Sequence, residues 1–159
     1  MVMQPNFAAD APGGVTVRAA ADIQRLWFTL SKRPWTFLVI MPAHARGDAT
    51  ELARRLAEVG TQHRGTTVRC LLAVNVEVSE TSHVIVEAIA QNPLEGATIV
   101  AVDSPLLNPA SIPIALAADG VLLLVTLGET DISAAKQTVE AIGKDRFFGT
   151  VTLAPDLGT

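Results

Sequence analysis

The sequence contains no tyrosine, a single cysteine and no long uninterrupted apolar run. The lone Cys70 cannot form an internal disulfide, which is typical of a reducing, cytoplasmic setting. The stretch 112–127 comes nearest to the ~18 apolar residues that a membrane span needs, but a proline and an Asp-Gly pair interrupt it. Because no basic region precedes an apolar core near the first residue, we also expect no signal peptide.

The chain also lacks a net positive charge and the residue spacing of a metal site. The net charge is -4 and the pI is about 5.3, which argue against nucleic acid as a main partner. The histidines His44, His63 and His83 stand on different segments without ligand spacing, so we expect surface positions and no metal site. The 159 residues, 49% of them apolar, suffice for one domain with its own core.

Short apolar runs and helical patterns alternate along the chain. Apolar runs bounded by turn residues are typical of strands buried on both faces of a parallel sheet. We expect strands at 36–41, 67–74, 99–102, 121–125 and 148–153, and helices at 20–30, 48–59, 79–91, 108–118 and 131–144. This predicts an α/β fold, a mainly parallel sheet of five or slightly more strands with helices on both faces. We expect a single domain over 20–154, with flexible tails at 1–19 and 155–159.

The stretch 97–127 has the pattern of a strand, an Asp-Ser-Pro turn, a helix and a second strand. Such a unit takes a right-handed crossover, which leaves Asp103 at the carboxyl end of its first strand. In open α/β sheets, ligands bind at this edge. Asp103 is therefore a candidate site residue, although a turn residue that accepts local N–H groups has the same sequence signature.

The loop after the first buried strand runs from Ala43 to Thr50 and reads Ala-His-Ala-Arg-Gly-Asp-Ala-Thr. On the phosphate-loop spacing of Gly, four residues, Gly, Lys and Ser or Thr, Ala43 and Asp48 replace the glycines and Ala49 replaces the lysine. Only Thr50 keeps its residue type. A phosphate loop needs backbone N–H groups and a lysine around the phosphates, so a carboxylate at Asp48 would repel them. We expect Asp48 to cap the following helix instead.

Several segments share one family resemblance. They are Ile-Gln-Arg-Leu-Trp-Phe-Thr-Leu from Ile23, the helix 49–57, Val-Ala-Val-Asp-Ser-Pro from Val100, Asp-Gly-Val-Leu-Leu-Leu-Val from Asp119 and Gly-Thr-Val-Thr-Leu from Gly149. Together, over about residues 21–154, they resemble the bacterial tyrosine-kinase branch of the MinD/ParA-like P-loop ATPases, which serves capsule and exopolysaccharide export. The resemblance implies a three-layer P-loop NTPase-like sandwich, with Asp103 at the end of its Walker B-type strand.

The expected nucleotide site departs from that family. Asn75 stands where the family places a magnesium-associated aspartate, and its amide carries no charge. We therefore expect no catalytic residue, no metal, no cofactor, and weak or absent binding of ATP and magnesium. The family's kinases phosphorylate a tyrosine cluster of their own, which a chain without tyrosine cannot do. What is left is a vestigial nucleotide site: Ala43, Arg46, Asp48, Ala49, Thr50, Asn75 and Asp103.

The resemblance implies a cytoplasmic, catalytically inactive kinase-like protein. It would act as an interaction or regulatory module in the synthesis and export of an exopolysaccharide such as capsule, holdfast or biofilm. Its partner would be a membrane polysaccharide co-polymerase or export component, through which the chain could associate with the membrane. Two alternatives stay open. One is a MinD/ParA-like protein that positions pili or division machinery, and the other is an active kinase or ATPase that uses Arg46 for phosphate and Thr50 with Asp103 for metal.

Two tryptophans flank the approach to the first buried strand. Trp27 and Trp35 are candidates for a self or partner contact, since aromatic residues are enriched at interface centres. Trp27 also shares the apolar face of the expected helix 20–30 with Ile23 and Leu26, so it could equally pack that helix on the sheet.

Overall fold

Strands and helices alternate through the computed structural model, which describes residues 14–89 and 96–154. The strands are β1 (Val15–Val17), β2 (Phe37–Pro42), β3 (Val68–Ala73), β4 (Ala97–Val102), β5 (Gly120–Thr126) and β6 (Phe147–Leu153). The helices are α2 (Ala20–Leu30), α3 (Thr50–Arg64), α4 (Thr81–Ile89), α5 (Ser111–Ala117) and α6 (Ile132–Ile142), with 3-10 turns η1 (Val78–Glu80) and η2 (Lys144–Arg146). The expected tails at 1–13 and 155–159, and the end of the expected helix 79–91, lie outside the described residues.

The sheet has six strands in the order β1-β6-β5-β2-β4-β3, and every pair is parallel. The middle strands β2 and β4 are buried along their whole length, because their residues are apolar on both faces. The predicted parallel sheet, with its buried central strands, is confirmed. All strands being parallel, their carboxyl ends meet at one edge of the sheet, where the loops after β2, β3 and β4 gather.

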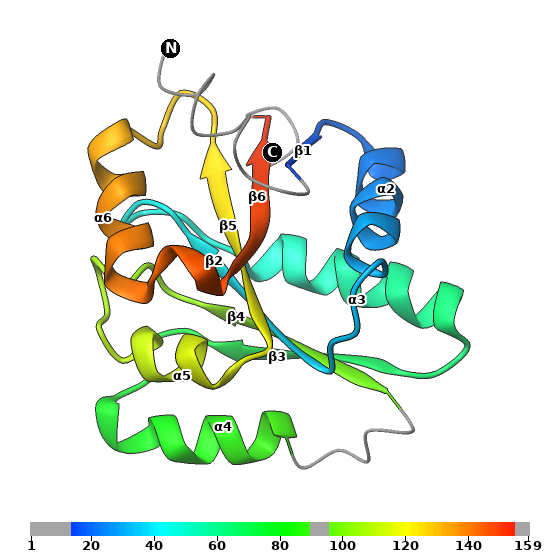
Figure 1. The fold of residues 1–159 in the computed structure, drawn as a ribbon, viewed down its shortest axis with the longest axis horizontal. Coiled ribbons are helices and arrows are strands. Elements are labelled where there is room, and N and C mark those ends of the chain that lie inside the picture. Colours follow the sequence, from blue (N-terminus) through cyan, green and yellow to red (C-terminus); the bar gives the residue numbers. More distant parts are fainter. Residues whose placement is uncertain (1–13, 90–95, 155–159) are drawn as a thin grey trace.

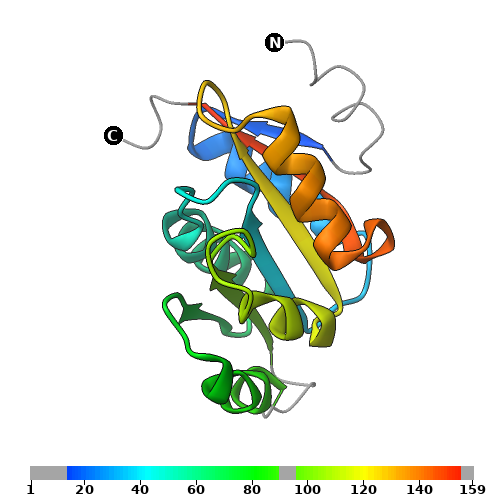
Figure 2. The same cartoon turned by 90° about the vertical axis from the view of Figure 1, so that its left-hand side faces the viewer.

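Helices cover both faces of this sheet. One core cluster contains the inward residues of α2 and α3, among them Leu26, Trp27 and Leu56, and the other contains those of α4, α5 and α6, among them Ile114. Figure 1 shows α2 and α3 to the right of the sheet, and Figure 2 shows α5 and α6 on its other side. The molecule is therefore the three-layer sandwich that the alternation predicted.

The N-terminal boundary of the domain was predicted incorrectly. Residues 15–17 fell within the expected tail 1–19, but Val15–Val17 forms strand β1. This strand pairs with β6 in the register Val15–Val151 to Val17–Leu153. Three residues are too short a run to be recognised as a strand from the sequence, and the strand depends on a neighbour that is far away in the sequence.

Helix α3 is longer than its sequence pattern predicted. The pattern predicted an end at residue 59, but Gly60 lies inside the helix, which ends at Arg64 with Gly65 in a left-handed conformation at φ 74°. A Cβ on Gly60 would lie 2.6 Å from Cζ3 of Trp27, so this glycine serves the contact between α3 and α2. Ile89, an apolar residue near the end of the described part of the expected helix 79–91, is 57% exposed.

The two tryptophans belong to the core. Trp27 is 2% exposed and Trp35 is 8% exposed, and their rings meet edge to face with centroids 5.7 Å apart and an interplanar angle of 76°. The expectation of a surface contact at these side chains is therefore wrong, and the alternative that Trp27 packs its helix on the sheet is correct. Among the described residues, no helix combines the length and apolar character needed to cross a membrane.

Candidate functional site

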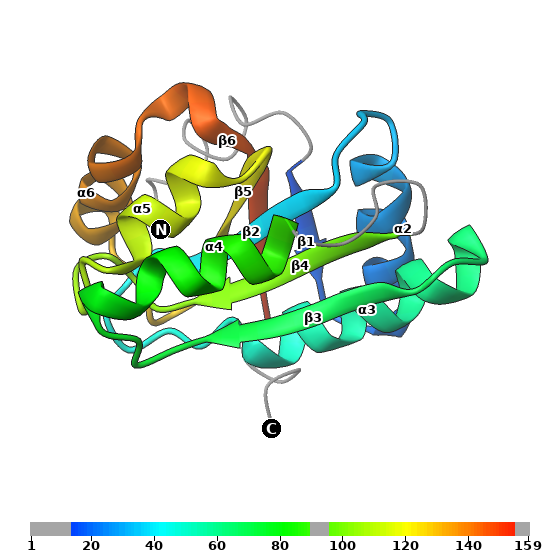
Figure 3. The same ribbon diagram turned by 90° about the horizontal axis from the view of Figure 1, so that it is seen from below.

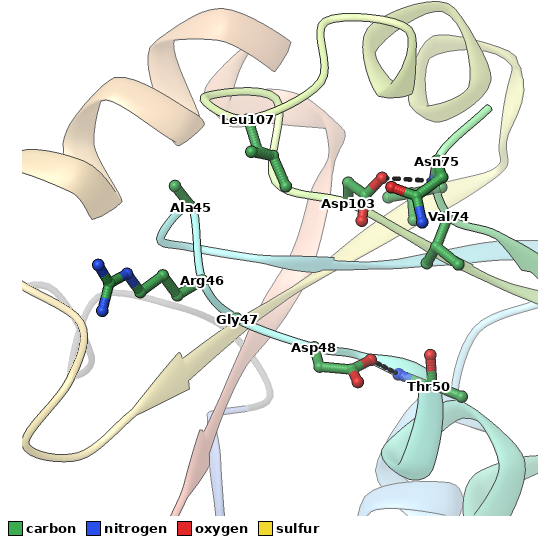
Figure 4. A pocket seen from close by; sticks show the side chains of 10 residues that line it. Ala45, Arg46, Gly47, Asp48, Thr50, Val74, Asn75, Asp103 and Leu107 are labelled. Atoms are coloured by element: carbon green, nitrogen blue, oxygen red, sulfur yellow. Dashed lines mark hydrogen bonds between the residues drawn. The ribbon is translucent and has the colours of Figure 1, made fainter. Parts of the chain in front are cut away.

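A pocket of about 450 Å³ opens at the carboxyl edge of the sheet, between the loops that follow β2, β3 and β4. It brings together Arg46, Asp48, Thr50, Asn75 and Asp103, which are five of the seven residues of the vestigial nucleotide site that the resemblance implied. Figure 4 shows these side chains with the apolar part of the wall. The other lining residues are Ala45, Gly47, Val74, Val102 and Leu107.

The remaining two residues of the predicted site, Ala43 and Ala49, do not line the pocket. Both are fully buried, and Ala49 belongs to the core cluster on the α2 and α3 side of the sheet. The position at which a phosphate loop carries its lysine is thus part of the hydrophobic core here. A lysine in this place would have to leave the core or lose its hydration.

Asp48 occupies the N-terminal end of α3. Its Oδ1 accepts a hydrogen bond from the Thr50 N–H at 2.9 Å. The helix begins at Thr50 with Ala49 as its N-cap, so the predicted cap at Asp48 is one residue too early. The physical role is nevertheless similar, because the carboxylate takes an N–H group that the helix cannot satisfy internally and complements the positive end of the helix dipole.

The loop between β2 and α3 is tied to the far half of the sheet. The Ala43 N–H donates to the Leu124 carbonyl at 2.8 Å, and the hydroxyl of Thr138 donates to the Ala43 carbonyl at 3.2 Å. Nδ1 of His44 and Oγ1 of Thr130 are hydrogen-bonded at 2.8 Å. These bonds hold the start of the loop against β5 and α6.

The side chain of His44 corrects another expectation. The sequence predicted a surface position, but this residue is only 9% exposed. Its Nε2 lies 3.7 Å from Oε1 of Glu129, too far for a hydrogen bond. Nothing in the sequence linked the loop at 44 with the one at 129–130. Only the parallel neighbours β2 and β5 bring them together.

Gly47 is needed for close packing rather than for binding. A Cβ at this position would lie 2.6 Å from Cβ of Pro42 and 3.2 Å from Cε1 of His44. Its N–H donates to the His44 carbonyl at 3.0 Å, which closes a tight turn. The glycine of this loop therefore stands one residue before the second glycine of a phosphate loop and has a different function.

Asp103 joins two loops across the sheet edge. Its Oδ2 accepts a hydrogen bond at 2.7 Å from the backbone N–H of Asn75, which has a left-handed φ of 57°. Asn tolerates this conformation better than most residues, which supplies a structural reason for an Asn here. Asn108, which sequence reasoning missed, adds a parallel link by donating from Nδ2 to the Val76 carbonyl at 2.9 Å.

The charges around the pocket do not suit a polyphosphate. Asp48 and Asp103 contribute two carboxylates, and Figure 4 shows the guanidinium of Arg46 pointing away from Asp103 and Asn75. Within the described ranges, Arg46 is the one cationic residue that lines this pocket. A phosphate at the loop would meet the Asp48 carboxylate where a phosphate loop offers a free N–H group.

We predict that Asp103→Asn changes the free energy of unfolding by no more than about 1 kcal/mol, because the amide oxygen can still accept the Asn75 N–H. Asp103→Ala removes the acceptor and should cost about 1–3 kcal/mol. Thermal unfolding of both variants and the wild type, with and without magnesium and ATP, measures these differences. A stabilisation of several degrees by magnesium and ATP in the wild type, lost in Asp103→Asn, would contradict a purely structural role.

Comparison with known proteins supports the fold and leaves the activity open. No protein-family profile and no curated protein matches the sequence. Among solved structures, the chain is similar to the BceF tyrosine kinase domain, with a TM-score of 0.53 and 14% identity over 85% of this chain and 77% of that one. At this identity the likeness shows the fold alone: a three-layer α/β sandwich similar to that of the BceF tyrosine kinase domain.

Proposed function

We propose that this chain is a catalytically inactive, kinase-like protein that acts as an interaction or regulatory module in exopolysaccharide synthesis and export. The observation that carries the proposal is the hydrogen bond from the Thr50 N–H to Asp48. The Asp48 carboxylate puts a negative charge at the N-terminus of α3. In a nucleotide-binding relative, a phosphate of the nucleotide would occupy this position. The buried Ala49 adds to this, because the loop has no lysine to offset the phosphate charge.

The size of the electrostatic effect supports the loss of nucleotide binding. Two unit charges 4 Å apart interact by about 1 kcal/mol in water and about 4 kcal/mol at an effective dielectric constant of about 20. Exchanging a lysine attraction for a carboxylate repulsion therefore costs about 2–8 kcal/mol, while a micromolar ligand binds with only about 8 kcal/mol in total. Asp48 is exposed, so the lower part of this range applies best. Even that part weakens binding by more than tenfold.

The metal position points the same way. Magnesium prefers carboxylates together with substrate phosphates. Asn75 supplies no charge, and Asp103 already accepts the Asn75 N–H. With no phosphate to bridge, the Asp103 carboxylate is better explained as the acceptor that links the backbone of the loop after β3 to the loop after β4.

The process assignment draws on the sequence resemblance to capsule and exopolysaccharide kinases and on the fold likeness to the BceF tyrosine kinase domain. The partner we propose is a membrane polysaccharide co-polymerase or export component, met in the cytoplasm. A chain without tyrosine cannot phosphorylate itself on tyrosine, so we propose that its effect comes through binding. The alternative is a protein that positions pili or division machinery. Deletion of the coding sequence in a host strain distinguishes the two. Deletion should change the amount of secreted polysaccharide, and expression of the Asp103→Asn variant in the deletion strain should restore it.

Calorimetric titration with ATP and magnesium tests the loss of nucleotide binding. We expect no specific binding below millimolar ATP, because Asp48 and Ala49 stand where a phosphate loop has glycine and lysine. Asp48→Asn is the matched control, since it keeps an acceptor for the Thr50 N–H and removes only the charge. A micromolar dissociation constant for the wild type, about -8 kcal/mol, would overturn the proposal in favour of an active nucleotide-binding enzyme.

A further inference from the structure

The two edges of the sheet differ in how well they are protected. Natural sheets blunt an exposed edge by keeping its strand short or by adding charge, proline or a bulge. At one edge, β1 has three residues, whereas at the other edge β3 has six. Figure 3 shows β3 as the outermost strand beside β4. Among the described strands, β4 is its only partner, so the outer backbone groups of β3 face outward.

Proline and bulges, two of the usual protective devices, are absent from β3, and its single charge is directed elsewhere. The strand reads Val-Arg-Cys-Leu-Leu-Ala, without proline, and pairs with β4 in an unbroken register from Val68–Ala97 to Ala73–Val102. Its one charged side chain, Arg69, turns back over the sheet and donates to the Glu87 carbonyl at 2.7 Å. The strand meanwhile leaves an apolar side chain, Leu72, 50% exposed.

A groove lies at the other end of the same strand. It measures about 400 Å³ and is lined by Val68 and Cys70 of β3 and by the flank of α3, including Ala57 and Thr61. Residues 68, 70 and 72 alternate with their neighbours and therefore share one face of the sheet. The edge thus carries an apolar knob, Leu72, and an apolar hole at Val68, four residues apart on the same strand and the same face.

We propose that two copies of this chain pair through β3 in antiparallel orientation, about a two-fold axis at Cys70. A two-fold axis perpendicular to the sheet keeps the faces matched and sets Leu72 of the second copy opposite Val68 of the first. Each exposed leucine then enters the groove of the other copy, and the outer backbone groups of both strands gain partners. The same patch serves both copies, as a closed dimer requires.

The charges on α3 agree with this arrangement. Arg54 and Glu58 lie one turn apart along the groove. In the two-fold pair the α3 helices run antiparallel. Arg54 of one copy is therefore on the side of Glu58 of the other copy. An extended segment of a different protein could use the edge strand but has no equivalent match between knob and hole. The pairing does not depend on nucleotide binding, so its test is independent of the test of the proposed function.

Sedimentation of the full chain over a range of concentrations tests the pairing. We expect a reversible dimer in the wild type and at least a tenfold weaker one in Leu72→Lys, because the charge would be buried in the groove. Leu116→Lys is the matched control, since this leucine is 46% exposed and lies on α5 across the sheet. A wild type that stays monomeric at several hundred micromolar, or a dimer unchanged by Leu72→Lys, would overturn the proposal.

A crosslink through Cys70 supplies a test that needs no variant at Leu72. Directly opposite residues in antiparallel strands have Cα atoms about 4.5–5.5 Å apart, within the range that a disulfide spans. Burial raises the pKa of the Cys70 thiol, so less thiolate is present at neutral pH, and oxidation with copper–phenanthroline should be run at alkaline pH. We expect a covalent dimer that Cys70→Ser abolishes. A solution dimer that resists this crosslink would show that the copies meet elsewhere and would overturn the axis at Cys70.

Discussion

Replacing Trp27 by alanine should lower the free energy of unfolding by about 3–5 kcal/mol, the usual cost of removing a large aromatic side chain from a core. The indole is 2% exposed and meets the ring of Trp35 edge to face at 5.7 Å. The indole also packs directly against Gly60, where an added Cβ would lie only 2.6 Å from Cζ3 of Trp27, so it fills the space between α2 and α3. The surrounding backbone belongs to two helices and cannot collapse freely into the cavity.

Phe28→Ala is the matched control for this experiment. Phe28 is the next residue of α2 and is aromatic, but it is 52% exposed, and its ring contacts only that of His63 at 4.8 Å among the rings of the described residues. Its removal should cost about 1 kcal/mol. Urea unfolding of both variants gives the two values. If Trp27→Ala were no more costly than Phe28→Ala, the core role of Trp27 would be wrong.

Gly60→Ala should destabilise the protein by about 1–3 kcal/mol, the cost of overpacking a core. In an open helix the same substitution stabilises by about 0.5–1 kcal/mol, because alanine loses less backbone entropy. Here the added Cβ would lie 2.6 Å from Cζ3 and 2.7 Å from Cη2 of Trp27, and 3.0 Å from Cγ2 of Val68. A rigid ring held on both sides cannot move by a few tenths of an ångström without disturbing α2, so the steric cost exceeds the entropic gain.

A double-mutant cycle with Trp27→Leu isolates this contact. Leucine removes the ring atoms that the new Cβ would strike, so Gly60→Ala should cost less in the Trp27→Leu background than in the wild type. We expect a coupling of about 1 kcal/mol or more, as is typical of residues in direct contact. Equal costs in both backgrounds would place the strain elsewhere, at Val68 or in the helix backbone.

The strands and helices were predictable because each follows from a local pattern. The central strands β2, β4 and β5 are continuous apolar runs, and such runs remain buried wherever the parallel sheet places them. The order of strands and helices then limited the topology to a parallel sheet with helices on both faces. β1 escaped prediction because its three residues are too short a run to be recognised from the sequence and are held by β6.

The edge of the sheet at which the candidate site lies was predictable, and the interactions within the site were not. Parallel strands end at the same edge, which placed Asp103 there, while the loop spacing and the family resemblance singled out Asp48 and Asn75; the observed order of β2, β4 and β3 brings the three together. The sequence could not show that Asp103 accepts the N–H of Asn75, since the two residues are joined only through the pairing of β3 and β4. His44 was misplaced for the same reason, because its partner Thr130 follows a different strand.

The sequence alone thus determined the fold class, the buried state of the central strands, and the presence of Asp48 and Ala49 where a phosphate loop would carry glycine and lysine. These are properties of local composition and spacing. Only the tertiary structure decided that Trp27 is a core residue and that Gly60 makes room for it. It also decided that β3, rather than the region of the tryptophans, presents an apolar edge. The physical reason is that the exposure of a side chain depends on the tertiary contacts that cover it, and these contacts are made by residues far apart in the chain.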